Sequence, residues 1–402
     1  MKNHRINRTL SKAFLIPSAL TARFFKRLKP AAEKEYFWKM SPDDKNWLSF
    51  RLKKHDFDGK IPVYIGDEKR IIEDILQKTR EKNQNNITRT DAYYRYFKRH
   101  QKLHWAFLAH MVSRNAGYHM TDLQGEFLKR LLTDEQRQKI YWTLETANSI
   151  IFQDVYPQLL LYEESKRLGR SLFHLLKGFD VSSFMRGVWE HFFWKKDSRI
   201  LTMALIINEQ NVIEKEVIQN DIHKEVFQSL PFQLQNLFQL TKIFFPVAGE
   251  KPKLAGIPVT AFRDLSKRIK IGKRLYSLLF HEKIFSGILE FADKQKHTGS
   301  RADYWGHVFS SDAAVYLPCY KKERIRFFSL KRKASPFYSP ELLSCWTIFY
   351  SSVSQKEDWF TGTALPPFFD GISHEKPLFI DRAYWIDLHH LEGAVLAKQL
   401  FT

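Results

Sequence analysis

Residues 91–117 have the sequence DAYYRYFKRHQKLHWAFLAHMVSRNAG, in which apolar side chains recur every three or four positions. This spacing is typical of an amphipathic helix, and Gly117 stands where such a helix is expected to end. On one helical face, Phe97, Phe107 and Met111 are joined by polar side chains, while lysines and arginines lie mainly on the opposite face. We therefore expect these polar residues to be buried: His100, His104, His110, Arg114 and Asn115.

Signals of further helices occur along most of the chain, whereas strand-like alternation is scarce. Residues 41–44 (SPDD) have the order of a helix cap followed by proline in the first turn. Thr133 and Gln136 have the spacing of a capping box. Only residues 61–65 and 324–330 alternate as strands do. We predict a mainly α, multi-helix globular fold with minor β content.

The length of 402 residues favours either one large domain or two medium ones. Residues 246–258 (PVAGEKPKLAGIP) are rich in proline and glycine and indicate a connection between two helical lobes. We predict a basic N-terminal arm with a short amphipathic helix at residues 1–35, and lobes at residues 36–245 and 259–402. The second lobe is expected to contain long loops.

Composition limits the class of protein and the compartment. Hydrophobic residues make up 44% of the chain, which is enough for a sizeable core and excludes a disordered protein. Two cysteines cannot form a disulfide framework, and no apolar run approaches the roughly 18 residues that a membrane span needs. We expect a soluble protein of the cytoplasm, with peripheral attachment to a membrane surface as an open alternative.

The net charge of +20 is concentrated in two basic segments. Residues 1–30 carry eight lysines and arginines and no acid, and residues 321–333 have a charge of +6. Such segments can bind an acidic partner, an anionic membrane surface or nucleic acid. The alternative is that the apolar face of the N-terminal helix docks on the body of the protein, leaving its basic face in water.

The second basic segment alternates cations with aromatic rings, a composition that suits single-stranded nucleic acid. It matches no recognised nucleic-acid-binding module, so a solvated basic loop or strand pair is an alternative interpretation. The candidate binding residues in this segment are Arg324, Arg326, Lys331 and Arg332.

Other helices repeat the placement of polar groups on apolar faces. Asn148, Asn208 and Glu209 each lie on or beside such a face, and unpaired burial of these groups would cost several kcal/mol, so partners are required. One interpretation is a structural network, for example Arg114 with Glu209 or Glu145. The other is a pocket among helices, with a histidine as general base, a carboxylate partner and Arg114 holding an anion. In the pocket interpretation, the catalytic candidates are His104, His110, Arg114 and Glu209, and the binding candidates are Asn115, Asn148 and Asn208.

Diagnostic catalytic patterns are missing from the sequence. No HExxH, GxxxxGK[ST], GxGxxG or GxSxG occurs, and we predict neither a metal site nor a cofactor. Asp387, His389 and Glu392 gather possible metal ligands, but neighbouring histidines diverge by about 100° on a helix. Whether the protein is an enzyme stays open.

Four stretches resemble a known family: residues 104–117 (HWAFLAHMVSRNAG), 120–123 (MTDL), 156–164 (YPQLLLYEE) and 205–211 (LIINEQN). They are similar to the uncharacterised YppC-like proteins of Bacillus and its relatives, a family of unknown function. The resemblance implies a bacterial cytosolic setting and no reaction. Our first hypothesis is a helical binding protein that uses its basic segments, and the alternative is an enzyme or small-molecule binder with a polar pocket.

Overall fold

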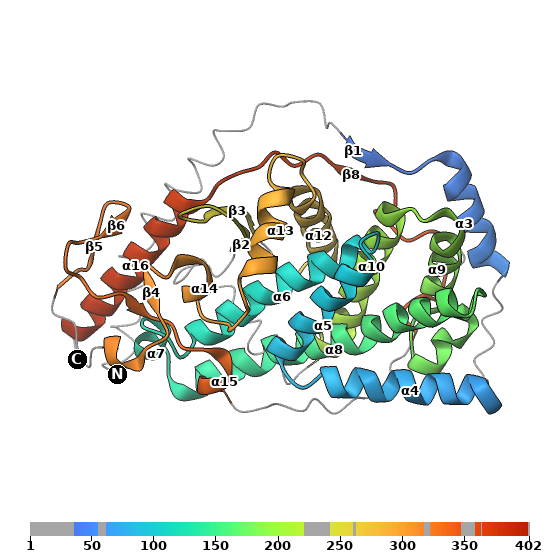
Figure 1. Cartoon of the computed structure of the whole chain (residues 1–402), viewed down its shortest axis with the longest axis horizontal. Coiled ribbons are helices and arrows are strands. Elements are labelled where there is room, and N and C mark those ends of the chain that lie inside the picture. Colours follow the sequence, from blue (N-terminus) through green and yellow to red (C-terminus); the bar gives the residue numbers. More distant parts are fainter. Residues whose placement is uncertain are drawn as a thin grey trace, which may run out of the picture.

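The structure, a computed structural model, describes residues 36–54, 62–220, 242–259, 263–316, 322–346, 358–362 and 364–400. It is mainly helical, with a long axis along which α6 and α8 run (Figure 1). The predicted fold class is confirmed. The helices in the described part are α3 (Pro42–Lys54), α4 (Gly66–Lys82), α5 (Asn86–Arg99), α6 (His104–Asp122), α7 (Leu128–Leu131), α8 (Asp134–Arg167), η1 (Phe173–Phe179), α9 (Ser183–Lys195), α10 (Ser198–Ile213), η2 (Glu214–Ile218), α12 (Leu265–Leu279), α13 (Phe285–Lys294), α14 (Ala302–Trp305), η3 (Ala313–Val315), α15 (Leu342–Cys345) and α16 (Asp381–Leu400).

The described strands are short and form four separate pairs. Three pairs are antiparallel and the pair β4–β7 is parallel. The expected strand at residues 61–65 is wrong for residues 62–65, which have no regular structure, and Ile61 lies outside the described residues. The pairs are β1 (Tyr36–Lys39) with β8 (Gly371–Ser373), β2 (Lys242–Val247) with β3 (Lys253–Pro258), β4 (Phe309–Ser310) with β7 (Phe337–Tyr338), and β5 (Ile325–Arg326) with β6 (Ser329–Leu330).

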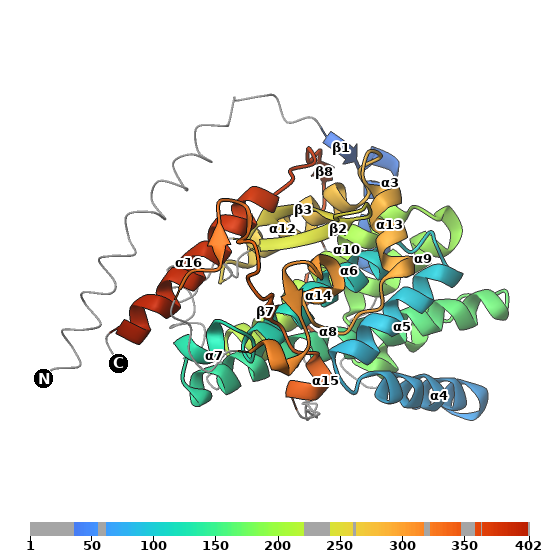
Figure 2. The same ribbon diagram turned by 60° about the vertical axis from the view of Figure 1, so that its left-hand side comes forward.

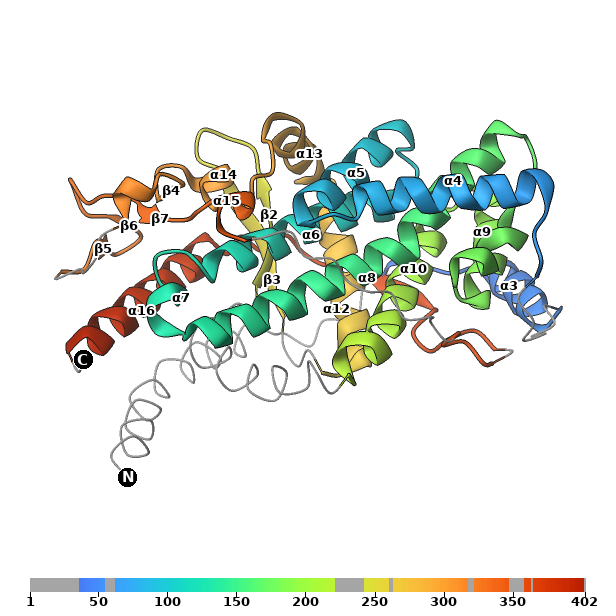
Figure 3. The same ribbon diagram turned by 90° about the horizontal axis from the view of Figure 1, so that it is seen from below.

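Helix α8 is a long support for the rest of the fold. It begins at the predicted capping box. The Thr133 hydroxyl accepts from the backbone nitrogen of Gln136, and the Gln136 side-chain oxygen accepts from the backbone nitrogen of Thr133. Gly169, just after its end, has a φ of +67°, as expected for a helix terminus. Helices α4 and α10 pack along α8 (Figure 3), so one rod fixes the position of several others.

The single helix expected across residues 91–117 is wrong, because the chain reverses between α5 and α6. His100 caps α5, and α6 starts at His104. The reversal lets polar side chains of the two helices meet: Thr90 donates from its hydroxyl to Ser113 at 2.8 Å, and its carbonyl oxygen lies 2.9 Å from His110 Nδ1. In a continuous helix these buried groups would be too far apart to form the two hydrogen bonds.

Gly117 is also placed differently from the prediction, since it lies inside α6 and not at a helix end. A Cβ atom at this position would come within 2.6 Å of both Asn86 Oδ1 and His297 Nε2. These two atoms are themselves 3.0 Å apart, so the hydrogen bond between them crosses directly over the glycine. Only a residue without a side chain permits this close approach.

Residues 246–258 are most of a β-hairpin and not an open connection. Pro246 pairs with Leu254 in the register of β2 and β3, and both strands carry buried side chains such as Phe244 and Phe245. The hairpin lies between α13 and α16 (Figure 2). One hydrophobic cluster includes residues from both sides of the hairpin, and the division into two lobes stays a prediction.

Asn115 attaches this hairpin to α6. Its amide nitrogen donates to the Phe244 carbonyl at 2.7 Å, and its amide oxygen accepts from the Phe244 backbone nitrogen at 3.1 Å. The Asn115 side chain is buried, and it bonds to backbone groups on the edge of β2 that no neighbouring strand pairs with and that water does not reach.

We expect Asn115→Ala to lower the free energy of unfolding by about 2–4 kcal/mol, because two buried backbone groups lose their partners. Urea unfolding followed by circular dichroism measures the loss. Asn148→Ala is the matched control, since the half-buried Asn148 amide donates to Leu144 of its own helix. Equal losses for the two variants would contradict the role of Asn115.

Candidate functional site

The inward orientation expected for the α6 polar residues is confirmed. His110 is 3% exposed and Arg114 is 1% exposed, while His104 is half-buried. Each histidine has its own partner: His104 Nδ1 lies 2.8 Å from the Tyr276 hydroxyl, and His110 donates to the Thr90 carbonyl. Burial lowers the pKa of His104 to about 4, so this imidazole is neutral at physiological pH.

Arg114 contacts neither Glu209 nor Glu145, and the suggested pairing is therefore wrong. Its guanidinium donates to the carbonyl oxygen of Gln295 at 2.9 Å and lies over the ring of Phe291. Glu145 instead pairs with Arg89 at 2.5 Å, a fully buried ion pair. Spacing along one helix identifies which residue is buried but not which distant carboxylate it meets.

Asn208 and Glu209 belong to a second cluster at the junction of α8 and α10. Asn208 donates to the Asp154 carboxylate and accepts from the Trp359 indole at 2.8 Å. Glu209 accepts from the Trp105 indole at 3.1 Å. Burial raises the pKa of Glu209 to about 8, because desolvation outweighs the hydrogen bonds from Gln210 and Trp105. The four proposed catalytic residues thus have separate partners, and their catalytic role stays a prediction.

We expect the stability of the protein to fall as pH rises from about 5 to about 8. The folded chain holds a proton on Glu209 that the unfolded chain, with an ordinary pKa near 4.5, has released. Glu209→Gln removes this loss, so the variant should gain roughly 2–4 kcal/mol relative to wild type over that range. Denaturant unfolding at both pH values measures the difference, and a pH-independent difference would contradict the raised pKa.

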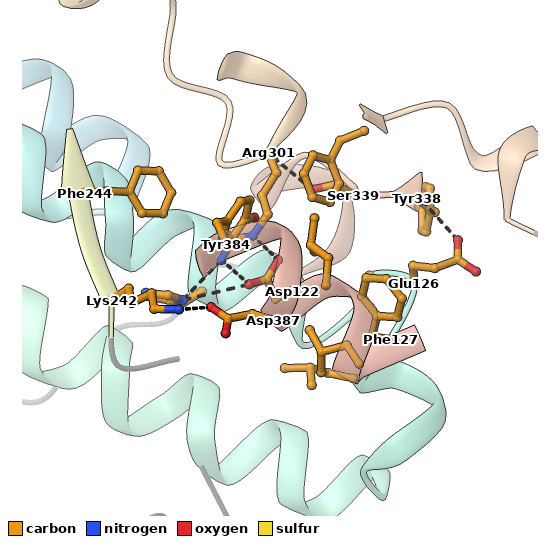
Figure 4. Close-up of a pocket in the computed structure, with 16 residues that line it drawn as sticks. Asp122, Glu126, Phe127, Lys242, Phe244, Arg301, Tyr338, Ser339, Tyr384 and Asp387 are labelled. Carbon is orange, nitrogen blue, oxygen red and sulfur yellow. Dashed lines mark hydrogen bonds and ion pairs between the residues drawn. The ribbon is translucent and has the colours of Figure 1, made fainter. Parts of the chain in front are cut away.

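A cavity lies near the C-terminal end of α6, and α16, β2 and the segment around α14 form its other walls (Figure 4). Its empty space is about 600 Å³, including the part open to solvent. None of the predicted catalytic residues lines it. The lining residues are His119, Asp122, Gly125, Glu126, Phe127, Leu128, Lys242, Phe244, Arg301, Phe309, Tyr338, Ser339, Tyr384, Asp387, Leu388 and Leu391.

Arg301 and Asp122 form a two-pronged ion pair in the cavity wall. Nε and Nη2 of Arg301 each donate to one Asp122 oxygen at 2.6 Å, and Nη1 donates to the Tyr304 hydroxyl. The Tyr304 hydroxyl lies 2.8 Å from that of Tyr384. Burial alone would raise the pKa of Asp122, but the Arg301 guanidinium keeps it below its usual value. This pair joins α6 to residues that follow it by about 180 positions.

Lys242 and Asp387 form a second buried pair in the same wall (Figure 4). Lys242 also donates to the Ala383 carbonyl at 3.3 Å. Burial raises the pKa of Asp387 to about 6 although Lys242 opposes the shift, and burial lowers the pKa of Lys242. Sequence patterns missed these residues because each comes from a different element. The sequence offers Asp387 and Glu392 only as possible metal ligands, and in the structure both bond to protein groups.

The described part of the second basic segment forms the β5–β6 hairpin, in agreement with the strand-pair interpretation. A single strand over residues 324–330 is wrong, because the chain turns at residues 327–328. Arg324 is not available to a partner: it is buried, and its guanidinium pairs with Glu126 at 2.9 Å. Its candidacy as a surface binding residue is therefore wrong. Arg326, Lys331 and Arg332 are exposed, whereas Lys321 lies outside the described residues.

Two phenylalanines form the turn of this hairpin. Phe327 and Phe328 connect the paired residues Arg326 and Ser329, and their side chains are 81% and 49% exposed. The hairpin lies at one end of the long axis, beside α16 (Figures 1 and 3). The exposed cations around the turn are Lys322, Arg326, Lys331, Arg332 and Lys333.

The comparisons with known proteins identify a family. The family model described as "Protein of unknown function (DUF2515)" matches residues 81–378. The chain belongs to this family. It is 36% identical over 319 residues to the uncharacterized protein YppC of Bacillus subtilis, a match that covers 79% of this chain and 91% of that protein. No solved structure matches the chain.

The family has no assigned reaction, so its membership gives the cavity and the hairpin no function. The stretch matched by the family model includes Asp122, Lys242 and Arg301, whereas Tyr384 and Asp387 of α16 follow it. Within the described residues, no helix combines the length and apolarity that a bilayer crossing requires.

Proposed function

We propose that this protein binds the anionic surface of a membrane through the β5–β6 hairpin, as a peripheral protein on the cytoplasmic side. The observation that carries the proposal is the turn of two exposed phenylalanines, Phe327 and Phe328, among exposed cations. Rings at a membrane interface bury in the acyl boundary while lysines and arginines contact lipid phosphates.

The backbone of the turn makes this choice of residues costly. Phe327 has a φ of +54°, a left-handed conformation that costs a residue with a side chain about 1–2 kcal/mol. Two-residue hairpin turns normally use glycine or asparagine at such positions. A phenylalanine there directs a large apolar ring into water and strains the backbone, and neither effect stabilises the free protein. If the ring inserts into a membrane, the binding free energy offsets the cost of its exposure and of the strained backbone.

The hairpin is also held rigidly at its base. Glu392 of α16 accepts from the backbone nitrogens of Arg324 and Ile325 at 2.7 and 3.0 Å. The Arg324 side chain pairs with Glu126 below the hairpin. The turn is therefore presented on a fixed support, which reduces the entropy that is lost on docking.

The arrangement favours a bilayer over single-stranded nucleic acid. Nucleic acid of this kind is bound in a basic groove where rings stack on successive bases. Here the two rings are at the convex turn, and Arg326 and Arg382 lie 5.8 Å from the centroids of Phe327 and Phe328, respectively. Apolar groups in front and cations behind suit the order of acyl chains and phosphates in a leaflet.

The composition of the first basic segment also favours binding to an anionic membrane. Residues 1–30 carry eight cations and no acid, although they lie outside the described residues. Stable attachment without a spanning helix generally needs two weak signals. The cytoplasmic leaflet is the anionic one, which is why we place the protein on that side.

We expect Phe327→Asn to weaken binding to vesicles of phosphatidylglycerol and phosphatidylcholine about tenfold, because one inserted ring is lost. Asparagine tolerates positive φ, so the free energy of unfolding should be unchanged or rise by up to about 1 kcal/mol. Vesicle co-sedimentation and urea unfolding measure the two effects.

Trp194→Gln is the matched control for this variant. Trp194 is 71% exposed, and its helix α9 lies at the opposite end of the long axis (Figure 1). Loss of vesicle binding in both variants, or in neither, would contradict a role of the hairpin.

Raising the salt concentration should weaken vesicle binding steeply, and vesicles of pure phosphatidylcholine should bind at least about tenfold more weakly, because lipid phosphates attract the exposed cations. Single-stranded oligo-dT serves as the competing probe in the same buffer. If oligo-dT binds more tightly than the anionic vesicles and Phe327→Asn weakens only that binding, the partner is nucleic acid and the membrane proposal fails.

A further inference from the structure

We propose that the cavity between α6, β2 and α16 binds a small, neutral, largely apolar molecule that carries a hydroxyl or carboxamide group. This inference does not depend on the proposed membrane binding. It rests on three features of the cavity: balanced charges, two polar atoms without partners, and apolar walls (Figure 4).

The charges in the cavity wall are already balanced by the protein. Arg301 pairs with Asp122, and Lys242 pairs with Asp387. Glu126 pairs with Arg130 and Arg324. A charged ligand would have to compete with these buried pairs or remain uncompensated, and both are costly. The balance therefore selects a ligand without net charge.

Asp387 supplies a buried acceptor. Its side chain is 6% exposed, and Oδ2 faces Lys242 while Oδ1 has no hydrogen-bond partner among the described residues. In Figure 4 one oxygen of Asp387 is joined to Lys242 and the other points away from it. A buried carboxylate oxygen without a donor is unfavourable, so a bound donor would stabilise it.

His119 supplies a buried donor. Nη2 of Arg301 lies 3.4 Å from His119 Nδ1, and Asp122 Oδ2 lies 3.8 Å from the same nitrogen. We assign Nδ1 as the acceptor of the shorter contact, because a guanidinium only donates. The proton of the neutral ring is then on Nε2, which is buried and has no partner within the described part of the chain. A hydroxyl or a carboxamide can both donate and accept, so its chemistry matches the acceptor of Asp387 and the donor of His119.

The remaining walls accept an apolar body. Phe127, Phe244 and Phe309 face the cavity together with three leucines. The combination of aromatic and aliphatic walls with a few fixed polar atoms is typical of small-molecule sites. Part of the cavity is open to solvent, which gives a compact ligand a route of entry.

The test uses the full chain without vesicles and four fluorinated probes observed by ¹⁹F NMR. Two probes carry the required group, 4-fluorobenzyl alcohol and 4-fluorobenzamide. Two lack it, 4-fluorotoluene and the anion 4-fluorobenzoate. At least one of the first two should bind about tenfold or more tightly than either of the others, because two hydrogen bonds are gained.

Leu391→Trp fills the cavity from its half-buried wall while all four ion-pair residues are retained, and it should abolish binding. Leu391→Phe adds less volume and gives the same test if the tryptophan variant does not fold. Leu400→Trp, at an 83% exposed position of the same helix, is the matched control and should bind as wild type.

The proposal is overturned if neither the alcohol nor the amide binds, if 4-fluorotoluene or 4-fluorobenzoate binds as tightly, or if a folded Leu391 variant retains binding. Each of these results concerns the cavity, whereas the vesicle experiments test the hairpin through variants of its own residues. Conversely, if the hairpin does not bind vesicles, the fluorinated probes are still expected to bind in the cavity.

Discussion

The C-terminal part of α6 and the turn after it join segments that are far apart in the sequence, and the fold depends on these polar contacts. Asn115 holds the backbone of β2, Asp122 holds Arg301, and Glu126 holds Arg324. All of these groups are largely shielded from water, so each must have a partner if the chain is to fold. Hydrophobic burial makes this region compact, but the polar contacts decide which elements meet there. They position both the wall of the cavity and the base of the hairpin.

Periodicity predicted the helical class and the burial of Arg114 and His110, because the position of a side chain on a helix depends only on local spacing. It could not predict the reversal at His100, which contains neither glycine nor proline. That reversal is favoured by contacts between α5 and α6 that exist only once the chain has turned. The same limit applies to Arg114, which donates to carbonyl oxygens more than 180 residues away and also pairs with the Asp303 carboxylate.

The cavity and the hairpin show where local patterns fail for function. Arg324 lies in the same basic stretch of sequence as its exposed neighbours. It is nevertheless buried, because it forms ion pairs with Glu126 and Glu392 of other elements. His119, Lys242 and Asp387 are ordinary residues in separate stretches, and only the folded chain brings them together. The basic character of residues 321–333 was visible in the sequence, whereas the projecting pair of rings required the backbone geometry of the turn.

Glu126 has a place in both regions, since it lines the cavity and also forms an ion pair with the residue at the root of the hairpin. Helix α16 does the same with Asp387 on one side and Glu392 on the other. Events in the two regions therefore act on common structural parts. If filling the cavity shifts the carboxylate of Glu126 or Asp387, the affinity of the hairpin turn for a membrane changes. Thermodynamic linkage then requires membrane binding to change the affinity of the cavity for its ligand by the same factor. One shared glutamate would then make a lipid-facing surface and an internal compartment report on each other.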